Sequence, residues 1–185
     1  MGIALADTAC EMGAEVHLVL GPVNTVPKHK EINVTNVTNA DSMARECIAL
    51  FPDCDVAILS AAVADYTPAD VSDRKLKKKD GILSLQLKPT VDIAYTLGKQ
   101  KRKNQLLAGF VLETDNEIKN ASGKLKSKNL DLIVLNSLRE EGAGFGHDTN
   151  RITIISRNNK IDKFELKSKE DVARDILNKI ISMMR

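Results

Sequence analysis

The sequence predicts an α/β fold with a Rossmann-like, doubly wound, mostly parallel sheet and a β-hairpin extension. Short apolar runs typical of buried strands alternate with amphipathic stretches typical of helices. The length of 185 residues is usual for one domain. No internal repeat, low-complexity tract or linker divides the sequence. We therefore expect a single domain over 1–185.

The first half of the chain is expected to alternate helices and strands. Gly13 is a natural stop for a helix, and Thr38 or Asn39 can cap the next one. The apolar run 56–60 has the length and composition of a fully buried strand. The expected elements are, in order, a helix over 3–12, strands over 16–20 and 32–37, a helix over 40–50 and a strand over 56–60.

The second half adds hairpins and a closing helix. Alternation of apolar and polar residues over 82–88 indicates an exposed hairpin strand. Asn158 and Asn159 suit the turn of a further hairpin, and Ser168 can cap the closing helix. The apolar stripe of that helix is Val172, Ile176, Ile180 and Met183. The remaining expected elements are helices over 92–101 and 116–128 and strands over 106–111, 130–135, 151–156 and 161–166.

Charge and hydropathy exclude several classes of partner. The chain has 27 Lys and Arg against 25 Asp and Glu, and this net charge of +2 is too small to indicate nucleic acid or a membrane. The basic residues are bunched over 74–79, 99–103 and 119–128, which suits a small polyanion. No apolar run reaches the roughly 18 residues of a spanning helix. No leader-like segment opens the sequence, so we expect a cytoplasmic protein.

Cysteine and histidine give no sequence signal for a metal or catalytic site. An odd number of cysteines without metal-ligand spacing predicts reduced thiols. The histidines are scattered and form no recognisable triad or dyad, so hydrolase chemistry is not supported. The residues concerned are Cys10, Cys47, Cys54, His17, His29 and His147.

The main candidate site follows the strand 56–60. Small residues at the carboxyl end of a strand let a ligand approach the backbone, and open α/β sheets bind nucleotides at this edge. Asp65, within the motif 61–66, can reach a ribose hydroxyl or a metal ion, although a turn or a helix cap would also use it. The basic run 74–79 follows, with Lys75 nearest the motif. It suits phosphate, but such runs also form solvated loops.

Further candidates lie on the neighbouring elements. Lys124 and Lys128 are four residues apart and share one helix face, either beside a phosphate or simply at the surface. Phe110 can flank a base or belong to the core. A helix that starts near 90–93 has free amides that attract an anion. The glycine-rich segment 142–146 opens no helix and is interpreted as a mobile flap.

The residues alone predict a domain that binds a phosphorylated nucleotide. An NAD-dependent oxidoreductase is an alternative from another class. It requires a glycine fingerprint that opens a helix and an acid about 20 residues further on, and the sequence has neither. Tyr95 and Lys99 match a Tyr-x-x-x-Lys spacing, but their predicted helix lacks a serine partner.

Taken in order, the motifs resemble phosphopantothenate–cysteine ligase, the synthetase domain of the bacterial bifunctional coenzyme A flavoproteins. The resemblance extends over essentially the whole chain. Each motif is weak evidence for the family by itself, but the shared order and spacing of the motifs make the resemblance specific. The matching stretches are 1–6, 21–23, 61–66, 75–78, 90–93, 109–110 with 113–114, 128–131 and 144–146.

The resemblance implies a nucleotide-dependent ligation with CTP and Mg²⁺. The carboxylate of 4′-phosphopantothenate would attack the α-phosphate to give an acyl-cytidylate and pyrophosphate, and the amine of cysteine would then displace CMP. Lys75 would be catalytic, and Asp65 would contact ribose or metal. The implied nucleotide-binding residues are Leu59, Ser60, Ala61, Asp65, Lys75, Thr90, Val91, Asp92, Ile93, Phe110, Lys124 and Lys128.

The resemblance also implies a strand and an Asn-containing loop before Met1, so the chain reads as an N-terminally truncated ligase domain. We expect lower stability and weak or absent catalysis without them, because unpaired buried backbone groups are costly. A catalytically incomplete nucleotide-binding fragment is therefore the second hypothesis. The family further implies a homodimer and a fused or separate decarboxylase partner.

Overall fold

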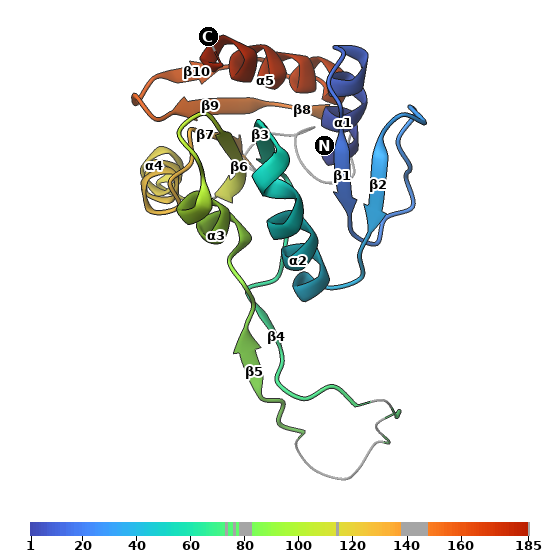
Figure 1. Cartoon of the computed structure of the whole chain (residues 1–185). Coiled ribbons are helices and arrows are strands. Elements are labelled where there is room, and N and C mark those ends of the chain that lie inside the picture. Colours follow the sequence, from blue (N-terminus) through green and yellow to red (C-terminus); the bar gives the residue numbers. More distant parts are fainter. Residues whose placement is uncertain (73, 76, 78–82, 114, 138–147, 185) are drawn as a thin grey trace.

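The computed structural model describes residues 1–72, 74–75, 77, 83–113, 115–137 and 148–184. A layered α/β body contains most of the helices and strands, and a long arm projects from it (Figure 1). The arm is rooted in a short antiparallel pair, β4 (Tyr66–Pro68) and β5 (Leu87–Pro89). No helix among the described residues is long and apolar enough to cross a bilayer.

The body is organised around a five-stranded sheet with the order β10-β9-β7-β6-β3. Neighbours β3, β6 and β7 are parallel, whereas β9 and β10 are added antiparallel. This mixed α/β arrangement with a mostly parallel centre confirms the expected fold class. The strands are β3 (Val56–Leu59), β6 (Leu106–Glu113), β7 (Leu132–Ser137), β9 (Ile152–Ser156) and β10 (Ile161–Lys163).

A second, two-stranded parallel sheet stands beside the first. It consists of β1 (His17–Leu20) and β2 (Asn33–Asn36). Among the described residues, β1 pairs only with β2, and β3 pairs only with β6. The expectation that 56–60 is fully buried is therefore wrong: β3 is half-buried throughout, because one of its edges has no partner strand in this part of the chain.

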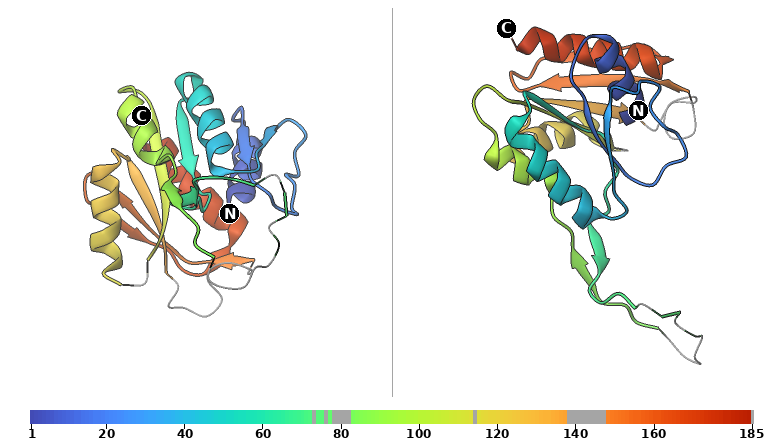
Figure 2. Two further views of the ribbon diagram at one scale, coloured as in Figure 1. Left: turned by 90° about the horizontal axis from the view of Figure 1, so that it is seen from below. Right: turned by 45° about the vertical axis from the view of Figure 1, so that its right-hand side comes forward.

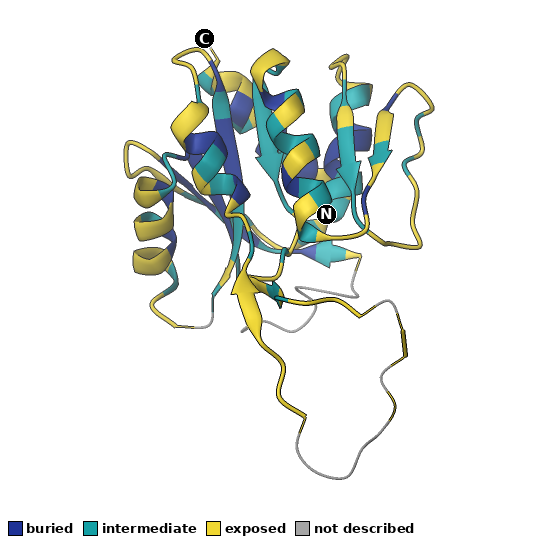
Figure 3. Cartoon of the chain, turned by 60° about the horizontal axis from the view of Figure 1, so that its bottom comes forward, coloured by how far each residue is buried: buried dark blue, intermediate teal, exposed yellow. Residues whose placement is uncertain are grey.

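Helices cover both faces of the sheet (Figures 1 and 2). One face packs against α1 (Gly2–Glu11) and α5 (Lys169–Met183), and the other against α2 (Ala40–Leu50), α3 (Ile93–Gln100) and α4 (Glu117–Ser127). Successive sheet residues alternate between the two cores: Val134 and Ile154 face α5, and Ile133 and Ile155 face α4. The buried residues accordingly gather between the layers (Figure 3).

Two predicted caps hold the helices that flank the sheet. The Asn39 side chain accepts a hydrogen bond from the amide of Ser42, whose hydroxyl accepts one from the Asn39 amide in return. The Ser168 hydroxyl accepts from the amide of Asp171 at the start of α5. The apolar stripe of α5 is buried as expected, except that Met183 is half-buried at the helix end.

A buried ion pair fastens the end of α3 to the sheet. The Lys101 ammonium donates to Asp131 Oδ2 at 2.6 Å, and the two side chains are 6% and 11% exposed. The same carboxylate oxygen accepts from the amide of Leu107 at 2.8 Å. Lys101 also donates to the carbonyl of Asn129 at 2.8 Å, so the pair satisfies backbone groups of two neighbouring segments.

Some expected strands are shorter than the sequence suggests. The alternation over 82–88 gives a strand only over Leu87–Pro89, since residues 83–86 extend into the exposed arm without a ladder. The strand expected over 161–166 ends at Lys163. The two-residue pair β8 (Thr149–Asn150) and β11 (Lys167–Ser168) was not predicted, because strands this short show no periodic pattern.

Candidate nucleotide site

A cavity of about 970 Å³ opens at the carboxyl ends of β3 and β6 and continues into the space between β1 and β3. Parallel strands place their carboxyl ends at one edge, which brings distant parts of the chain together. The lining includes every predicted site residue except Lys75: Leu59, Ser60, Ala61, Asp65, Thr90, Val91, Asp92, Ile93, Phe110, Lys124 and Lys128.

The floor of the site is formed where β3 and β6 run side by side. Leu59 is in register with Gly109, and Phe110 follows directly on β6. A Cβ at position 109 would meet Leu130 Cδ1 at 2.9 Å, so a larger residue there would force the buried Leu130 side chain to shift. Phe110 is half-buried, packs against the α1/α5 core and also lines the cavity, and its contact with a base stays a prediction.

The start of α1 lies against the end of β3. A Cβ atom on Gly2 would stand 2.7 Å from Ser60 Oγ, so Gly2 lies directly against the Ser60 side chain. Among the described residues no side chain caps α1, so its first amides can meet a ligand. A helix start with free amides carries a partial positive charge that favours an anion.

The root of the arm forms one rim of the cavity. The Thr90 hydroxyl donates to the carbonyl of Ala64 at 2.6 Å, and the Thr90 amide donates to the carbonyl of Asp65 at 2.9 Å. These bonds fix the backbone of Ala64 and Asp65, within the motif 61–66, to Thr90. The Asp65 carboxylate is exposed at this rim, outside any helix, so the helix-cap interpretation does not apply to it.

The start of α3 differs from the expectation of free amides. Asp92 is the N-cap, and its carboxylate accepts from the amide of Tyr95 at 3.0 Å and from the Lys128 ammonium at 3.0 Å. Burial raises the pKa of this carboxyl, but the hydrogen bonds from Tyr95 and Lys128 outweigh burial, and the net pKa is lowered. The amide of Tyr95 is thus occupied by an internal anion, and the binding of a ligand anion at the start of α3 stays a prediction.

Lys124 and Lys128 both reach the cavity, as their shared helix face predicted. Each cation already has a carboxylate partner: Lys124 contacts Glu113 at 2.7 Å, and Lys128 contacts Asp92. The hydrogen bond from Lys124 lowers the pKa of Glu113, which is therefore anionic at neutral pH. The two cations at the cavity are thus held in place by internal anions.

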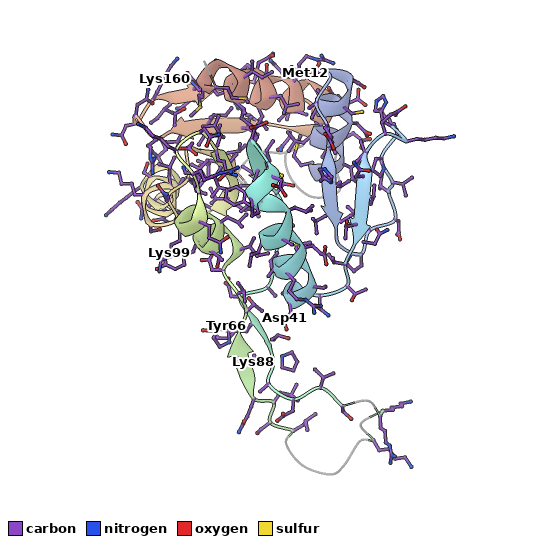
Figure 4. All side chains as sticks on the ribbon, viewed as in Figure 1. Met12, Asp41, Tyr66, Lys88, Lys99 and Lys160 are labelled. Carbon is purple, nitrogen blue, oxygen red and sulfur yellow. The ribbon has the colours of Figure 1, made fainter. Side chains whose placement is uncertain are left out.

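Lys75 is the predicted residue that the cavity does not include. It is exposed on the arm, as are Arg74 and Lys77. Tyr66 and Lys88 mark the root of this arm, and the ribbon continues from them away from the body (Figure 4). The rest of the basic run, at 76 and 78–79, and the glycine-rich segment 142–146 lie outside the described residues.

The Tyr95 and Lys99 pair lies on the outer surface of α3. The Lys99 ammonium sits 4.5 Å from the centre of the Tyr95 ring, a cation–π contact, and Tyr95 is 44% exposed. Neither residue lines the cavity. This position gives no support to the oxidoreductase alternative.

Other walls of the cavity were missed by sequence reasoning. They come from the helices on both sides of the space between β1 and β3, namely Leu5 of α1, Met43 of α2 and Ile180 of α5. The apolar periodicity of these helices predicts that the residues are buried, but it does not predict which strand edge they pack against. A second cavity of about 900 Å³ shares Gly2 and Ser60 with the first.

A family model described as the DNA/pantothenate metabolism flavoprotein C-terminal domain matches residues 1–184. A relative from an unknown prokaryotic organism, named cysteine/cysteine sulfinic acid decarboxylase, is 60% identical over 184 residues, 100% of this chain and 51% of that protein. The coenzyme A biosynthesis bifunctional protein CoaBC of Bacillus subtilis (strain 168) is 42% identical over 185 residues, 100% of this chain and 45% of that protein.

A crystal structure of the C-terminal domain of a coenzyme A biosynthesis bifunctional protein CoaBC superposes with a TM-score of 0.83 at 35% identity, covering 99% of this chain and 81% of that one. The chain spans about half the length of the curated relatives it matches. These similarities confirm the resemblance indicated by the motifs. The chain belongs to the family of DNA/pantothenate metabolism flavoprotein C-terminal domains.

Proposed function

We propose that this chain carries the nucleotide-binding and ligating half of a 4′-phosphopantothenate–cysteine ligase in coenzyme A biosynthesis. The observation that supports this most is the single cavity in which the ends of β3 and β6, the start of α3 and the cations of α4 meet. Its position at the carboxyl edge of parallel strands suits a nucleotide. The CoaBC relatives support the ligase class, since their names state coenzyme A biosynthesis.

The proposed reaction uses CTP. The 4′-phosphopantothenate carboxylate attacks the α-phosphorus, the bond from that phosphorus to the pyrophosphate oxygen breaks, and pyrophosphate leaves. The cysteine amine then attacks the acyl carbon, loses a proton and displaces CMP, which forms the amide. Lys124, Lys128 and the first amides of α1 would supply positive charge where negative charge develops on the phosphate oxygens.

We assign the Mg²⁺ of the nucleotide complex to Asp65. Mg²⁺ is usually held by one or two carboxylates together with substrate phosphates. Asp65 offers one exposed carboxylate at the cavity rim, which fits that donor set, whereas Asp92 is engaged by Lys128 and by the Tyr95 amide. The Mg²⁺ ion would neutralise negative charge on the phosphates, and the Asp65 carboxylate would fix the position of the ion.

The arm supports a proposed homodimer. It exposes Val71, Leu83, Leu85 and Leu87, which are 57–80% accessible. Exposed apolar side chains on one extension are typical of an association surface. In this proposal Lys75 reaches a nucleotide in one of two ways. Either the arm folds toward a cavity, or a second copy of the chain contributes its arm.

The name of the 60% identical relative describes a protein of which this chain spans 51%, so we assign no decarboxylation to these residues. A fused or separate decarboxylase partner is part of the proposal. The second hypothesis is a module that binds the nucleotide without turnover. It is favoured by the width of the cavity between β1 and β3, which share no ladder among the described residues.

The first experiment is thermal unfolding with Mg²⁺ and, separately, CTP, ATP and NAD. A ligand at about 100 times its Kd adds about 2.7 kcal/mol, a rise of about 5–10 °C at this size. We expect the rise with CTP and its loss in Lys128→Gln. Lys126→Gln, on the same helix but outside the cavity, is the matched control. A rise with NAD alone would contradict the ligase assignment.

Turnover is measured separately, as pyrophosphate released with 4′-phosphopantothenate and cysteine present. CTP-dependent release that requires both substrates supports the ligase. A CTP-induced thermal shift without pyrophosphate release supports the binding module instead. The two hypotheses are thus distinguished by the second assay and not by the first.

A further inference from the structure

The fold brings together three side chains whose sequence spacing gave no metal signal. Cys10 lies near the end of α1, and His29 and Glu31 lie in the connection between β1 and β2. Their sulfur, nitrogen and oxygen ligand atoms all lie within 4.8 Å of one another. We propose that these three residues form a transition-metal site, with Zn²⁺ as the metal. None of them lines either cavity, so the site is independent of the proposed ligase.

The sulfur, nitrogen and oxygen ligand atoms of these three side chains indicate which metal ion can bind. Zn²⁺ accepts thiolate, imidazole and carboxylate ligands together, whereas Ca²⁺ and Mg²⁺ require oxygen ligands. Zinc–ligand bonds of about 2.0–2.3 Å place tetrahedral donors less than about 4 Å apart. The three atoms must therefore approach one another slightly on binding. Glu31 is exposed and can supply this movement by changing its rotamer, while Cys10 and His29 are half-buried.

The surroundings of His29 already restrain it. The buried Asp7 carboxylate accepts hydrogen bonds from the amides of Lys28 at 2.8 Å and of His29 at 3.4 Å. Glu11 Oε1 lies 3.4 Å from His29 Nε2. Carboxylates beside histidine ligands fix the ring orientation and raise its basicity. Glu11 is therefore assigned as a positioning residue for His29.

A metal here would add a further link between α1 and the β1–β2 connection, which already share the hydrogen bonds of Asp7 and Glu11. The β1–β2 sheet has no ladder to the five-stranded sheet among the described residues. A metal bound by Cys10 and His29 would clamp the β1–β2 connection to α1. With three protein ligands, the fourth position of a tetrahedral site remains for water. Three protein ligands would thus hold the metal, one fewer than in a typical structural zinc site.

The test uses the whole reduced chain, stripped of metal and titrated with Co²⁺ without oxygen. We expect one Co²⁺ per chain, a thiolate-to-metal charge-transfer band in the near ultraviolet, and displacement by Zn²⁺. Cys10→Ser should remove the band, and His29→Gln and Glu31→Gln should weaken Zn²⁺ binding by about tenfold or more. Glu11→Gln should weaken it by about 10–100-fold with the band retained.

Cys47→Ser and His17→Gln are the matched controls, since they lie outside the cluster and should bind as the wild type does. Far-ultraviolet circular dichroism checks each fold. Glu31→Gln changes only an exposed side chain, so its result stands even where Cys10→Ser fails to fold. The proposal is overturned if the wild type binds neither metal at micromolar concentration, or if Glu31→Gln and His29→Gln bind Zn²⁺ as tightly as the wild type.

Discussion

The Lys128 ammonium lies 3.0 Å from the Asp92 carboxylate, so the end of α4 and the start of α3 are joined by an ion pair at the cavity. Both residues are partly exposed, at 30% and 47%. A phosphate that approaches Lys128 must therefore share this cation with Asp92. The ion pair therefore affects the charge of the candidate site and the way in which the stability of α3 depends on acid pH.

The lowered pKa of Asp92 predicts an acid-sensitive contribution to stability. The folded-state pKa is below the unfolded value of about 3.9, so the contribution is present above that pH and is lost as the pH falls through the folded value. Asp92→Asn should lower the Tm at pH 7 and change it little at pH 2. Asp70→Asn, on the exposed arm, should show no such difference. Equal Tm losses at both pH values would contradict the prediction.

The buried pair of Lys101 and Asp131 predicts a large loss on breaking it. Asp131→Asn should cost about 3–5 kcal/mol, because Lys101 is left as an uncompensated buried charge. The double variant Lys101→Met/Asp131→Asn should recover part of this loss. Urea unfolding of the four proteins in a double-mutant cycle measures the coupling. Strictly additive losses would show that the two charges act independently.

Gly98 and Gly123 form a matched pair of helical glycines with opposite expectations. A Cβ at Gly98 would overlap the backbone oxygen of Lys128, whereas one at Gly123 meets nothing within 4 Å. Gly98→Ala should destabilise by about 1–3 kcal/mol through overpacking. Gly123→Ala should stabilise by up to about 1 kcal/mol through helix propensity. Chemical denaturation measures both, and a neutral Gly98→Ala would refute the close approach of α3 to Lys128.

The proposed homodimer predicts that a change on the arm alters association without altering the fold. Leu85 is 62% exposed, so Leu85→Lys should leave the Tm of the monomer unchanged. If the arm carries the interface, sedimentation equilibrium should show weaker dimerisation in this variant. Leu166→Lys, at a 47% exposed position away from the arm, is the control. If Leu85→Lys left dimerisation unchanged, the dimer interface would lie elsewhere on the chain.

The caps and the helix stripes could be predicted because they depend on neighbours in the chain. Asn39, Ser168 and the α5 stripe have the roles that local rules assign to them. The burial of β3 was overestimated, since burial also depends on which strands pair at its two edges. Asp92 was interpreted as part of an anion site, but it is itself the anion at that helix start.

The candidate site could be predicted in position because parallel strands end at one edge. The role of Lys75 stays a prediction, since the arm that carries it projects from the body. The approach of Cys10 to His29 could not be predicted from spacing, because it depends on how the β1–β2 connection folds over α1. Contacts between segments that are distant in the sequence depend on tertiary packing, and they produce no periodic pattern in the sequence.

Within the part of the chain that the structure describes, one edge of β3 has no partner strand, and this has a consequence for solvent exchange and for handling the protein. In a strand, successive amides point to opposite sides, so alternate amides of Val56–Leu59 face β6 and the others face away from it. The first set should exchange with deuterium slowly and the second quickly within the same strand. Such an edge also offers donors and acceptors to any extended peptide, which makes it a template for self-association at high concentration.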